Sequence, residues 1–296
     1  MKPAPFDYRR PDSLDEALAI FAELGSDAKA LAGGQSLVPA MNFRLARPTV
    51  LVDLNRLDPL AYIAESPDGG LRIGAMTRQR AAERSPAVAG RASLLFEAMP
   101  WIAHPQIRNR GTVGGSLAHA DPAAELPAVM VALDARFVLR SRTASRTVPA
   151  QGFYTGILTT DLRPDELLTE VQIPPRAARS GTAFMELARR QGDFALVGVA
   201  VELVLDESGA CASARIVLLS VGDGPVLANT AMAALVGSVP TASRIEEAAR
   251  VAGEADIDPP SDIHASASYR RHLARVLVRR AVTRAAERAA EAGGAA

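Results

Sequence analysis

The sequence predicts an α+β protein with more than one hydrophobic core, and three observations support this class. Its 296 residues exceed the length that a single core usually serves. Helical and strand-like patterns alternate through the first half of the chain. After a break at Pro174 and Pro175, strand-like runs followed by a long helical stretch indicate a three-stranded antiparallel sheet with helices.

The first helix is predicted from a capping box, Ser13 followed by Glu16, and from the apolar residues at helical spacing that come after it. Strand-like residues 28–32 then run into the pair Gly33-Gly34, and a helical pattern resumes at 37–41. We therefore expect a strand, a glycine turn and a helix in that order.

A second glycine pair, Gly114-Gly115, is expected to form another turn ahead of a helix whose apolar face includes Leu126 and Leu133. Further strands are expected at 50–54, 71–75, 136–140 and 170–173, with a helix at 81–93. Beyond a linker that runs through Gly181, the patterns predict strands at 184–188, 195–205 and 214–221, and helices from about residue 231 onwards.

The composition excludes several classes of function and indicates where the protein is located. Lys and Arg together equal Asp and Glu, at 33 each, so nucleic acid is not expected as a partner. No apolar stretch approaches the roughly 20 residues of a membrane span, and residues 1–8 lack the features of a secretory signal, so we expect a cytoplasmic protein. Because Cys211 is the single cysteine, any cysteine-bound iron–sulfur cluster must belong to a partner chain.

Both glycine pairs have polar neighbours that suit a phosphate. Paired glycines admit positive φ and let backbone N–H groups approach an anion closely. Gln35 and Ser36 beside the first pair, and Thr112 and Ser116 beside the second, can donate further hydrogen bonds. Either pair alone is equally well explained as a tight turn, but together they favour a site for the two phosphates of a dinucleotide.

Other common sites lack support. Neither glycine pair belongs to a Gly-x-Gly-x-x-Gly or P-loop motif, and no Gly-x-Ser-x-Gly elbow indicates a hydrolase. The four histidines have no metal-ligand spacing, so no metal is expected in this chain. We therefore expect a nucleotide fold of another type.

Two carboxylates precede or begin the helix after the second glycine pair. Asp121 and Glu125 lie four residues apart, near the positive end of that helix. They suit two readings equally, as N-terminal caps or as acceptors of hydrogen bonds from a ribose hydroxyl or a flavin N–H. The charged loop 189–194, which ends in Phe194, is either a solvated turn or a mobile part of a site.

Several segments together resemble the medium, FAD-binding subunit of the xanthine dehydrogenase and carbon monoxide dehydrogenase family of molybdenum hydroxylases. These segments are 31–37, 111–118, 121–125, 166–174 and 189–195, and the similarity spans nearly the whole chain. It implies a two-subdomain FAD-binding domain of the vanillyl-alcohol-oxidase (PCMH) type, followed by a small α+β domain. The expected boundaries are 1–176, with subdomains at about 1–57 and 58–176, and 180–292.

The resemblance also implies a set of cofactor-binding residues. Those expected around FAD are Leu31, Ala32, Gly33, Gly34, Gln35, Ser36, Leu37, Ile102, Ala103, Thr112, Gly114, Gly115, Ser116, Ala120, Asp121, Glu125, Leu168 and Phe194. Where some relatives have a lysine before the Arg-Arg loop, this chain has Met185 and Glu186. The loss of a cation near the flavin leaves NAD, quinone and oxygen open as acceptors.

The implied function is electron transfer. A small subunit with [2Fe-2S] clusters and a large subunit with a molybdopterin-type molybdenum cofactor are the expected partners, in a dimer of heterotrimers. Electrons pass from the [2Fe-2S] partner through FAD to an external acceptor. One alternative is a stand-alone flavin-dependent oxidoreductase of the same superfamily, and another is a nucleotide-binding regulatory or scaffold module. The substrate of the whole enzyme lies outside this chain and stays open.

Overall fold

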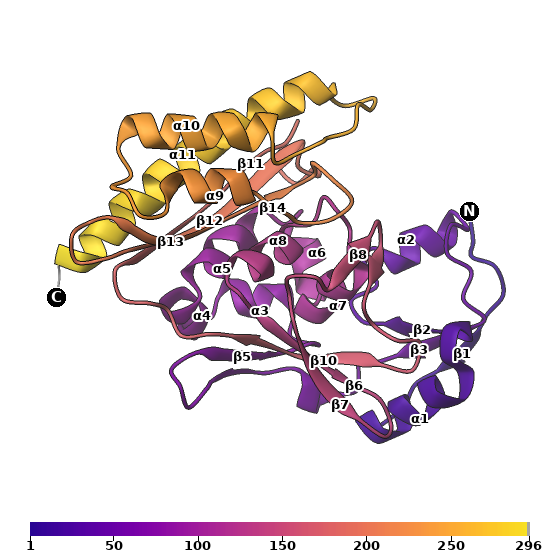
Figure 1. The fold of residues 1–296 in the computed structure, drawn as a ribbon. Coiled ribbons are helices and arrows are strands. Elements are labelled where there is room, and N and C mark those ends of the chain that lie inside the picture. Colours follow the sequence, from indigo (N-terminus) through magenta and orange to yellow (C-terminus); the bar gives the residue numbers. More distant parts are fainter. Residues whose placement is uncertain (295–296) are drawn as a thin grey trace.

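The computed structural model describes residues 1–294. Its N-terminal part is a small parallel sheet flanked by helices (Figure 1). Its elements are β1 (Asp7–Arg9), α1 (Leu14–Leu24), the 3-10 helix η1 (Gly25–Asp27), β2 (Ala28–Leu31), α2 (Leu37–Asn42) and β3 (Val50–Asp53). The strands lie in the order β1-β3-β2, and both pairs are parallel. Ser13 accepts a hydrogen bond from the Glu16 amide, which confirms the predicted start of α1.

The middle part is an antiparallel sheet of five strands in the order β4-β5-β10-β6-β7, with a layer of short helices on one face (Figure 1). Its strands are β4 (Ile63–Glu65), β5 (Leu71–Gly74), β6 (Arg136–Arg140), β7 (Ser145–Pro149) and β10 (Leu167–Ile173), and β8 (Tyr154–Gly156) pairs separately with β9 (Thr159–Thr160). The helices are η2 (Asp58–Leu60), α3 (Gln79–Glu83), α4 (Pro86–Arg91), α5 (Ser93–Ala98), η3 (Met99–Trp101), α6 (Pro105–Arg110), α7 (Val113–His119) and α8 (Glu125–Ala132).

The C-terminal part is a second antiparallel sheet covered by three helices (Figure 1). It comprises β11 (Ser180–Leu187), β12 (Val197–Leu205), β13 (Cys211–Leu219), β14 (Val226–Leu227), α9 (Asn229–Leu235), α10 (Ala242–Glu254) and α11 (Ala267–Gly294). The α+β class is thus confirmed, but the expected three strands are wrong: the sheet has four, in the order β11-β12-β13-β14. The fourth strand has only two residues, too few for a sequence pattern to register.

Two other expectations need correction. The helix predicted at 81–93 is two helices, because Ser85 caps a new helix that begins with Pro86. The linker predicted through Gly181 is already part of β11, where Gly181 pairs with Leu203. A side chain at position 181 would meet the backbone of Ala285 in α11, so glycine lets this helix pack closely on the strand.

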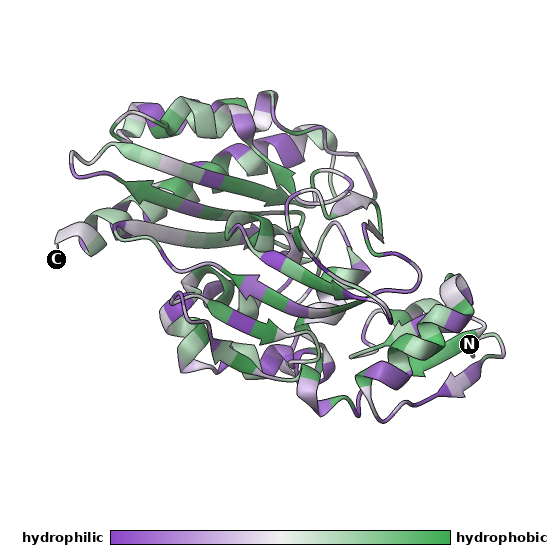
Figure 2. Cartoon of the chain, turned by 60° about the horizontal axis from the view of Figure 1, so that its bottom comes forward, coloured by the Kyte–Doolittle hydropathy of each residue, from purple (hydrophilic) through white to green (hydrophobic). Residues whose placement is uncertain are grey.

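Three clusters of buried apolar side chains hold these parts together. One surrounds α1 and the parallel sheet, another fills the space between the C-terminal sheet and α9 to α11, and the largest lies around the middle helices. The largest cluster includes Phe184, Ala200 and Leu219 from the C-terminal sheet. The helix layer therefore packs on both antiparallel sheets, and the strands of the C-terminal sheet are largely hydrophobic (Figure 2).

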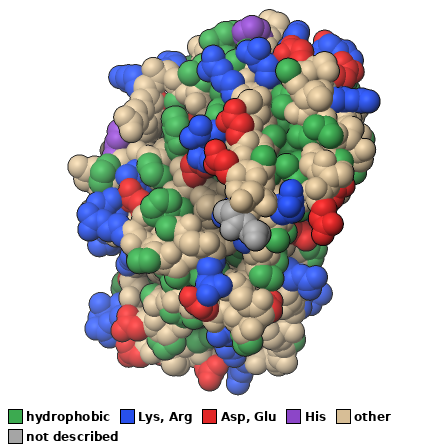
Figure 3. Space-filling view, turned by 90° about the vertical axis from the view of Figure 1, so that its left-hand side faces the viewer, with side chains coloured by type: hydrophobic (Ala, Val, Ile, Leu, Met, Phe, Trp, Pro, Cys, Tyr) green, Lys and Arg blue, Asp and Glu red, His purple; other side chains and the backbone are tan. Residues whose placement is uncertain are grey.

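Polar contacts also cross this interface. The Ser93 and Thr182 hydroxyls lie 3.0 Å apart, and Arg288 of α11 pairs with Glu97 of α5 at 2.7 Å. On the outer face shown in Figure 3, basic and acidic side chains lie intermixed, in keeping with a formal net charge of zero. Among residues 1–294, no helix is both long enough and apolar enough to cross a bilayer.

Candidate cofactor site

The first glycine pair forms the turn that was predicted between β2 and α2. Gly34 has a φ of 73°, a conformation that glycine adopts at little cost. Within residues 1–294, the backbone N–H groups of residues 33–36 donate to no protein acceptor. Ser36 is exposed, and its hydroxyl makes no hydrogen bond to any residue that the structure describes. The turn therefore presents a run of available donors, as an anion requires.

The second glycine pair differs from its prediction, since it lies in the first turn of α7 and forms no glycine turn. Its amides are already used: Gly114 N donates to Ala75 O at 2.8 Å, and Gly115 N donates to Thr112 Oγ1 at 3.1 Å. Thr112 is thus the N-cap of α7. This segment offers no free amide at the glycines, but within residues 1–294 the Thr112 N–H and the hydroxyls of Thr112 and Ser116 donate to no acceptor.

Close packing explains the second pair instead. A Cβ atom at Gly114 would lie 2.8 Å from both Cα and O of Ala75, which is shorter than side chains tolerate. A Cβ atom at Gly115 would lie 2.6 Å from Thr112 Oγ1. The two glycines therefore allow α7 to sit directly against the residue that follows β5.

The two glycine segments meet at the joint between the parallel and the antiparallel sheet. A Cβ atom at Gly33 would lie 2.5 Å from Arg110 O and 2.7 Å from Gly111 Cα, just ahead of α7. A Cβ atom at Gly115 would in turn lie 3.2 Å from Ala32 Cβ. The structure thus brings together two segments that lie about eighty positions apart in sequence.

Arg78 is a member of this site that sequence reasoning missed. Its guanidinium donates to Asn55 Oδ1 at 2.7 Å and also to Arg110 O, and Asn55 Nδ2 donates to Ala32 O at 2.9 Å. Within residues 1–294, Arg78 forms no ion pair. Burial, and then the charge of Arg110, lower the pKa of Arg78. A cation without a carboxylate partner therefore lies between the two segments.

The structure separates the roles of the two predicted carboxylates. Asp121 Oδ1 accepts a hydrogen bond from Ala123 N at 2.9 Å, so Asp121 caps the turn that follows Ala120, the left-handed end of α7. Glu125 begins α8, is 7% exposed, and within residues 1–294 no other residue donates a hydrogen bond to its carboxyl. Burial, and then the charge of Asp121, raise the pKa of Glu125 to about 7. Glu125 is not a cap.

The remaining predicted residues lie at various depths. Ile102 and Leu168 are buried in the same large cluster that contains Leu117 of α7, and Ala103 packs against that cluster. Arg108 Nη1 donates to Ile102 O at 2.7 Å and holds this stretch in place. Phe194 is 69% exposed on the loop after β11. That loop reaches the middle helices at Gly192, where a Cβ atom would meet the His104 ring.

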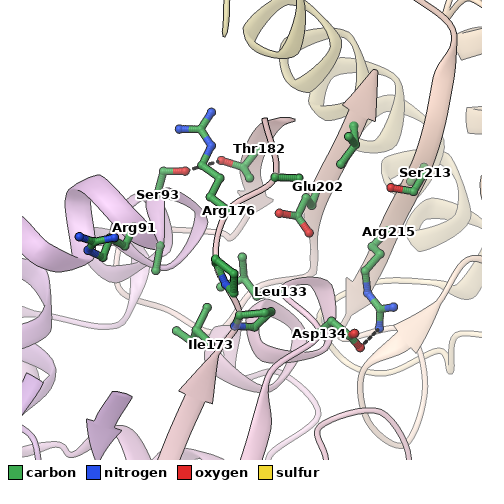
Figure 4. A pocket seen from close by; sticks show the side chains of 16 residues that line it. Arg91, Ser93, Leu133, Asp134, Ile173, Arg176, Thr182, Glu202, Ser213 and Arg215 are labelled. Atoms are coloured by element: carbon green, nitrogen blue, oxygen red, sulfur yellow. Dashed lines mark hydrogen bonds and ion pairs between the residues drawn. The ribbon is translucent and has the colours of Figure 1, made fainter. Parts of the chain in front are cut away.

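A separate cleft opens where the C-terminal sheet meets the middle part, and Figure 4 shows its lining. It encloses about 360 Å³ and includes the ion pair of Arg215 with Asp134 at 3.3 Å, together with Glu202. Neither glycine segment contributes to it. Among residues 1–294, no group of three or more metal-ligating side chains occurs.

The fold and the candidate site define a class: a small parallel sheet and an antiparallel sheet with two glycine segments meeting at their joint, followed by a helix-covered sheet. Comparison with known proteins identifies that class. The family described as FAD binding domain in molybdopterin dehydrogenase matches residues 4–176, and CO dehydrogenase flavoprotein C-terminal domain matches residues 182–285. The chain belongs to this family of flavoprotein subunits, which confirms the resemblance seen in its sequence.

Relatives with different reactions align over almost the whole chain. The 6-hydroxypseudooxynicotine dehydrogenase complex subunit alpha of Paenarthrobacter nicotinovorans is 45% identical, over 95% of this chain and 94% of its own length. A solved carbon monoxide dehydrogenase chain from Hydrogenophaga pseudoflava has a TM-score of 0.93 at 41% identity, over 97% of this chain and 99% of that one. Quinoline 2-oxidoreductase from Pseudomonas putida 86 gives 0.91 at 40%, over 98% and 99%.

Proposed function

We propose that this chain binds FAD at the joint of the two glycine segments and passes electrons from an iron–sulfur partner through the flavin to an external acceptor. One observation carries the proposal. The first glycine turn, whose amides are available, lies next to Arg78 and to the start of α7. Free donors and a cation suit the pyrophosphate of a dinucleotide.

At the pyrophosphate end, we assign the donors to residues 33–36 and to Arg78. The amides of the turn would bind phosphate oxygens, the hydroxyls of Ser36 and Ser116 would add hydrogen bonds, and Arg78 would balance the charge. Leu31, Ala32, Gln35 and Leu37 shape the turn. Gly114 and Gly115 act by placing α7, since their amides are bonded within the protein, and Thr112 does so by accepting from Gly115 N.

At the flavin end, we assign the apolar contacts to Ile102, Ala103 and Leu168, which lie in or against the large buried cluster. Ala120, Asp121 and Glu125 would line the polar edge, and Phe194 the exposed face. FAD supplies the redox chemistry, because a flavin takes up electrons singly and releases them in pairs. The side chains of this chain bind, orient and shield the cofactor, and none need act as an acid or base on a substrate.

The partners in this proposal are a small [2Fe-2S] subunit and a large molybdenum subunit, in a dimer of heterotrimers in the cytoplasm. Cys211 is the single cysteine and is buried, so it is unsuited to holding a cluster. Names of relatives such as "complex subunit alpha" and "medium chain" support a heteromeric enzyme. In this proposal, FAD is bound by the domain at 1–176, whose subdomains lie at about 1–57 and 58–176. The C-terminal domain, at 180–292, covers the middle helices.

The test is to purify the chain from its native host and to record the visible spectrum together with iron and molybdenum content. Flavin and cluster absorption with both metals is the expected result. Flavin with neither metal would favour a stand-alone flavoenzyme. The absence of flavin would overturn the proposed site.

A further inference from the structure

Two buried glutamates, Glu125 and Glu186, lie on either side of the interface between the middle helices and the C-terminal sheet. Ser220 N donates to Pro122 O at 2.9 Å just ahead of α8, and the strand register places Leu219, Gly198 and Glu186 side by side across the sheet. Glu186 lies on β11 in the same row as Thr182 and Phe184, which contact Ser93 and Trp101 of the middle layer. Glu125 starts α8, which packs on β12 and β13 of the same sheet. Alternation along β11 thus points Glu186 towards the layer that contains Glu125.

The surroundings of Glu186 leave its carboxyl without a partner. Glu186 is 7% exposed, and its Oε2 atom is buried and has no hydrogen-bond partner within residues 1–294. The residue opposite it on β12 is Gly198, where a Cβ atom would lie 3.2 Å from Glu186 Cβ. An ionised carboxylate in such a place would be costly, so the neutral, protonated form is favoured.

The charge of Glu125 acts on Glu186. Burial, and then the negative charge of Glu125, raise the pKa of Glu186 to about 8, while the pKa of Glu125 is raised to about 7. When one carboxyl loses its proton, the charge left behind holds the proton of the other. Both groups therefore hold their protons to a higher pH than an ordinary glutamate does.

Among residues 1–294, no Lys, Arg or His forms an ion pair with Glu125 or Glu186. Arg108 of α6 acts on Glu125 but is bound to Glu83 and to the carbonyl oxygens of Ile102 and Ala103. The other charged groups on the elements packed around the pair lie on two sides. On the side of α8 and the middle helices they are Asp121 and His119 before α8, Arg215 near its end, and Glu97 of α5, which pairs with Arg288. On the side of the C-terminal sheet they are Glu202 on β12, Arg280, Arg284 and Glu287 of α11 beside Met185, and Arg189, Arg190 and Asp193 on the loop after β11.

We propose that Glu125 and Glu186 form a proton-holding pair whose ionised member takes up a proton when electrons arrive at the flavin and releases it when they leave. This inference rests on the proposed function, in which Glu125 borders the FAD. The electrons stay on the flavin, and only a proton moves, from solvent to a carboxylate oxygen. Uptake offsets the added negative charge, a role that no cation fills at this place.

The first test measures whether the pair holds a proton, by following the free energy of unfolding of the full chain with pH. Carboxyls with a folded pKa above the unfolded value of about 4.3 stabilise fully below that value and lose this contribution as pH rises through the folded pKa. Stability should therefore fall between about pH 5 and pH 8. E125Q and E186Q should each flatten this fall, and the double variant should flatten it less than the sum. A fall that both variants leave unchanged would overturn the pair.

The second test asks whether the proton follows the electrons. Infrared difference spectra between the dithionite-reduced and oxidised FAD-containing protein should show a gain of protonated carboxyl that shifts in D₂O and is lost in E186Q. E202Q is the matched control, since burial also raises the pKa of Glu202 on the same face of the sheet, and its spectra should keep the gain. No gain in the wild-type protein would overturn the coupling.

These results are distinguishable from failure of the proposed function. A chain without bound FAD would overturn that function and with it the coupling to electrons. The dependence of unfolding on pH would still decide whether the pair holds a proton, because that measurement needs no cofactor.

Discussion

Gly33 with Gly34 and Gly114 with Gly115 look alike in sequence, since each pair precedes a helical segment and has a serine close behind it. In the structure, the first pair leaves its backbone donors available, whereas every glycine donor of the second pair is bonded within the protein. The difference shows that a glycine pair can serve a ligand directly or can serve another part of the same chain. Substitutions in the two segments should accordingly affect different measurements.

The largest effect is expected from Gly114→Ala. The added methyl group would meet the backbone of Ala75, which is anchored by its bond to Gly114 N and has little freedom to shift. Overpacking of this kind costs up to roughly 3 kcal/mol in the free energy of unfolding. Urea denaturation with and without FAD measures it. A change below about 0.5 kcal/mol would contradict the close packing of α7 described above.

Gly34→Ala should mainly impair cofactor binding. A non-glycine residue in the left-handed conformation costs about 1–2 kcal/mol, and relaxation of the turn would displace its donors from the phosphate. FAD affinity should fall at least tenfold, or about 1.4 kcal/mol, as measured by fluorescence titration. Gly209→Ala is the matched control, since Gly209 has a φ of 81° in a hairpin turn with open space around it. Equal loss of affinity in both variants would contradict a role for the first turn.

Arg78→Gln should weaken FAD binding by about tenfold, because a charge-assisted hydrogen bond contributes roughly 1.5 kcal/mol or more. The loss should diminish at high salt, since screening already weakens the wild-type contact. Arg84→Gln is the control, as Arg84 is exposed on the neighbouring turn. Titrations at two salt concentrations compare the variants. An unchanged affinity for Arg78→Gln would remove Arg78 from the proposed site.

The smallest effect is expected from Thr112→Ala. Loss of the N-cap hydrogen bond to Gly115 N should reduce the free energy of unfolding by about 1 kcal/mol. Thr112→Ser keeps the cap and should recover most of that loss in thermal denaturation. If the two variants were equally unstable, the hydroxyl would not be the feature that stabilises α7.

Much of the fold was predictable because its signals are local. The capping box of α1 and the apolar runs of β3 and β12 appear in the sequence close to their final bounds. β4 and β14 were missed because strands of two or three residues leave no periodic pattern. The prediction of a turn at Gly114 was wrong because a glycine in a sequence has two common explanations. It can adopt positive φ, or it can allow close packing because it lacks a side chain, and here the second applies.

The candidate site was only partly predictable, because its members meet through long-range contacts. Gly33 touches the stretch before α7 only after two sheets have assembled side by side. Arg78 carries no motif and gains its role from Asn55 and Arg110. Glu186 gave a weak signal, which was interpreted only as the absence of a lysine. It is a charged residue in an otherwise apolar strand, and strand alternation puts it on the same face as Phe184, which predicts a buried carboxyl.

Close contact between Gly181 and α11 has a consequence for synthesis on the ribosome. The strand that contains Gly181 is made early, while the turn of α11 that covers it, at Ala285 and Ala289, is made much later. Chains fold from the N-terminal domain onwards as they emerge. A nascent chain therefore passes through a stage in which the first two sheets are complete while β11 and β12 still expose the apolar face that α11 will cover.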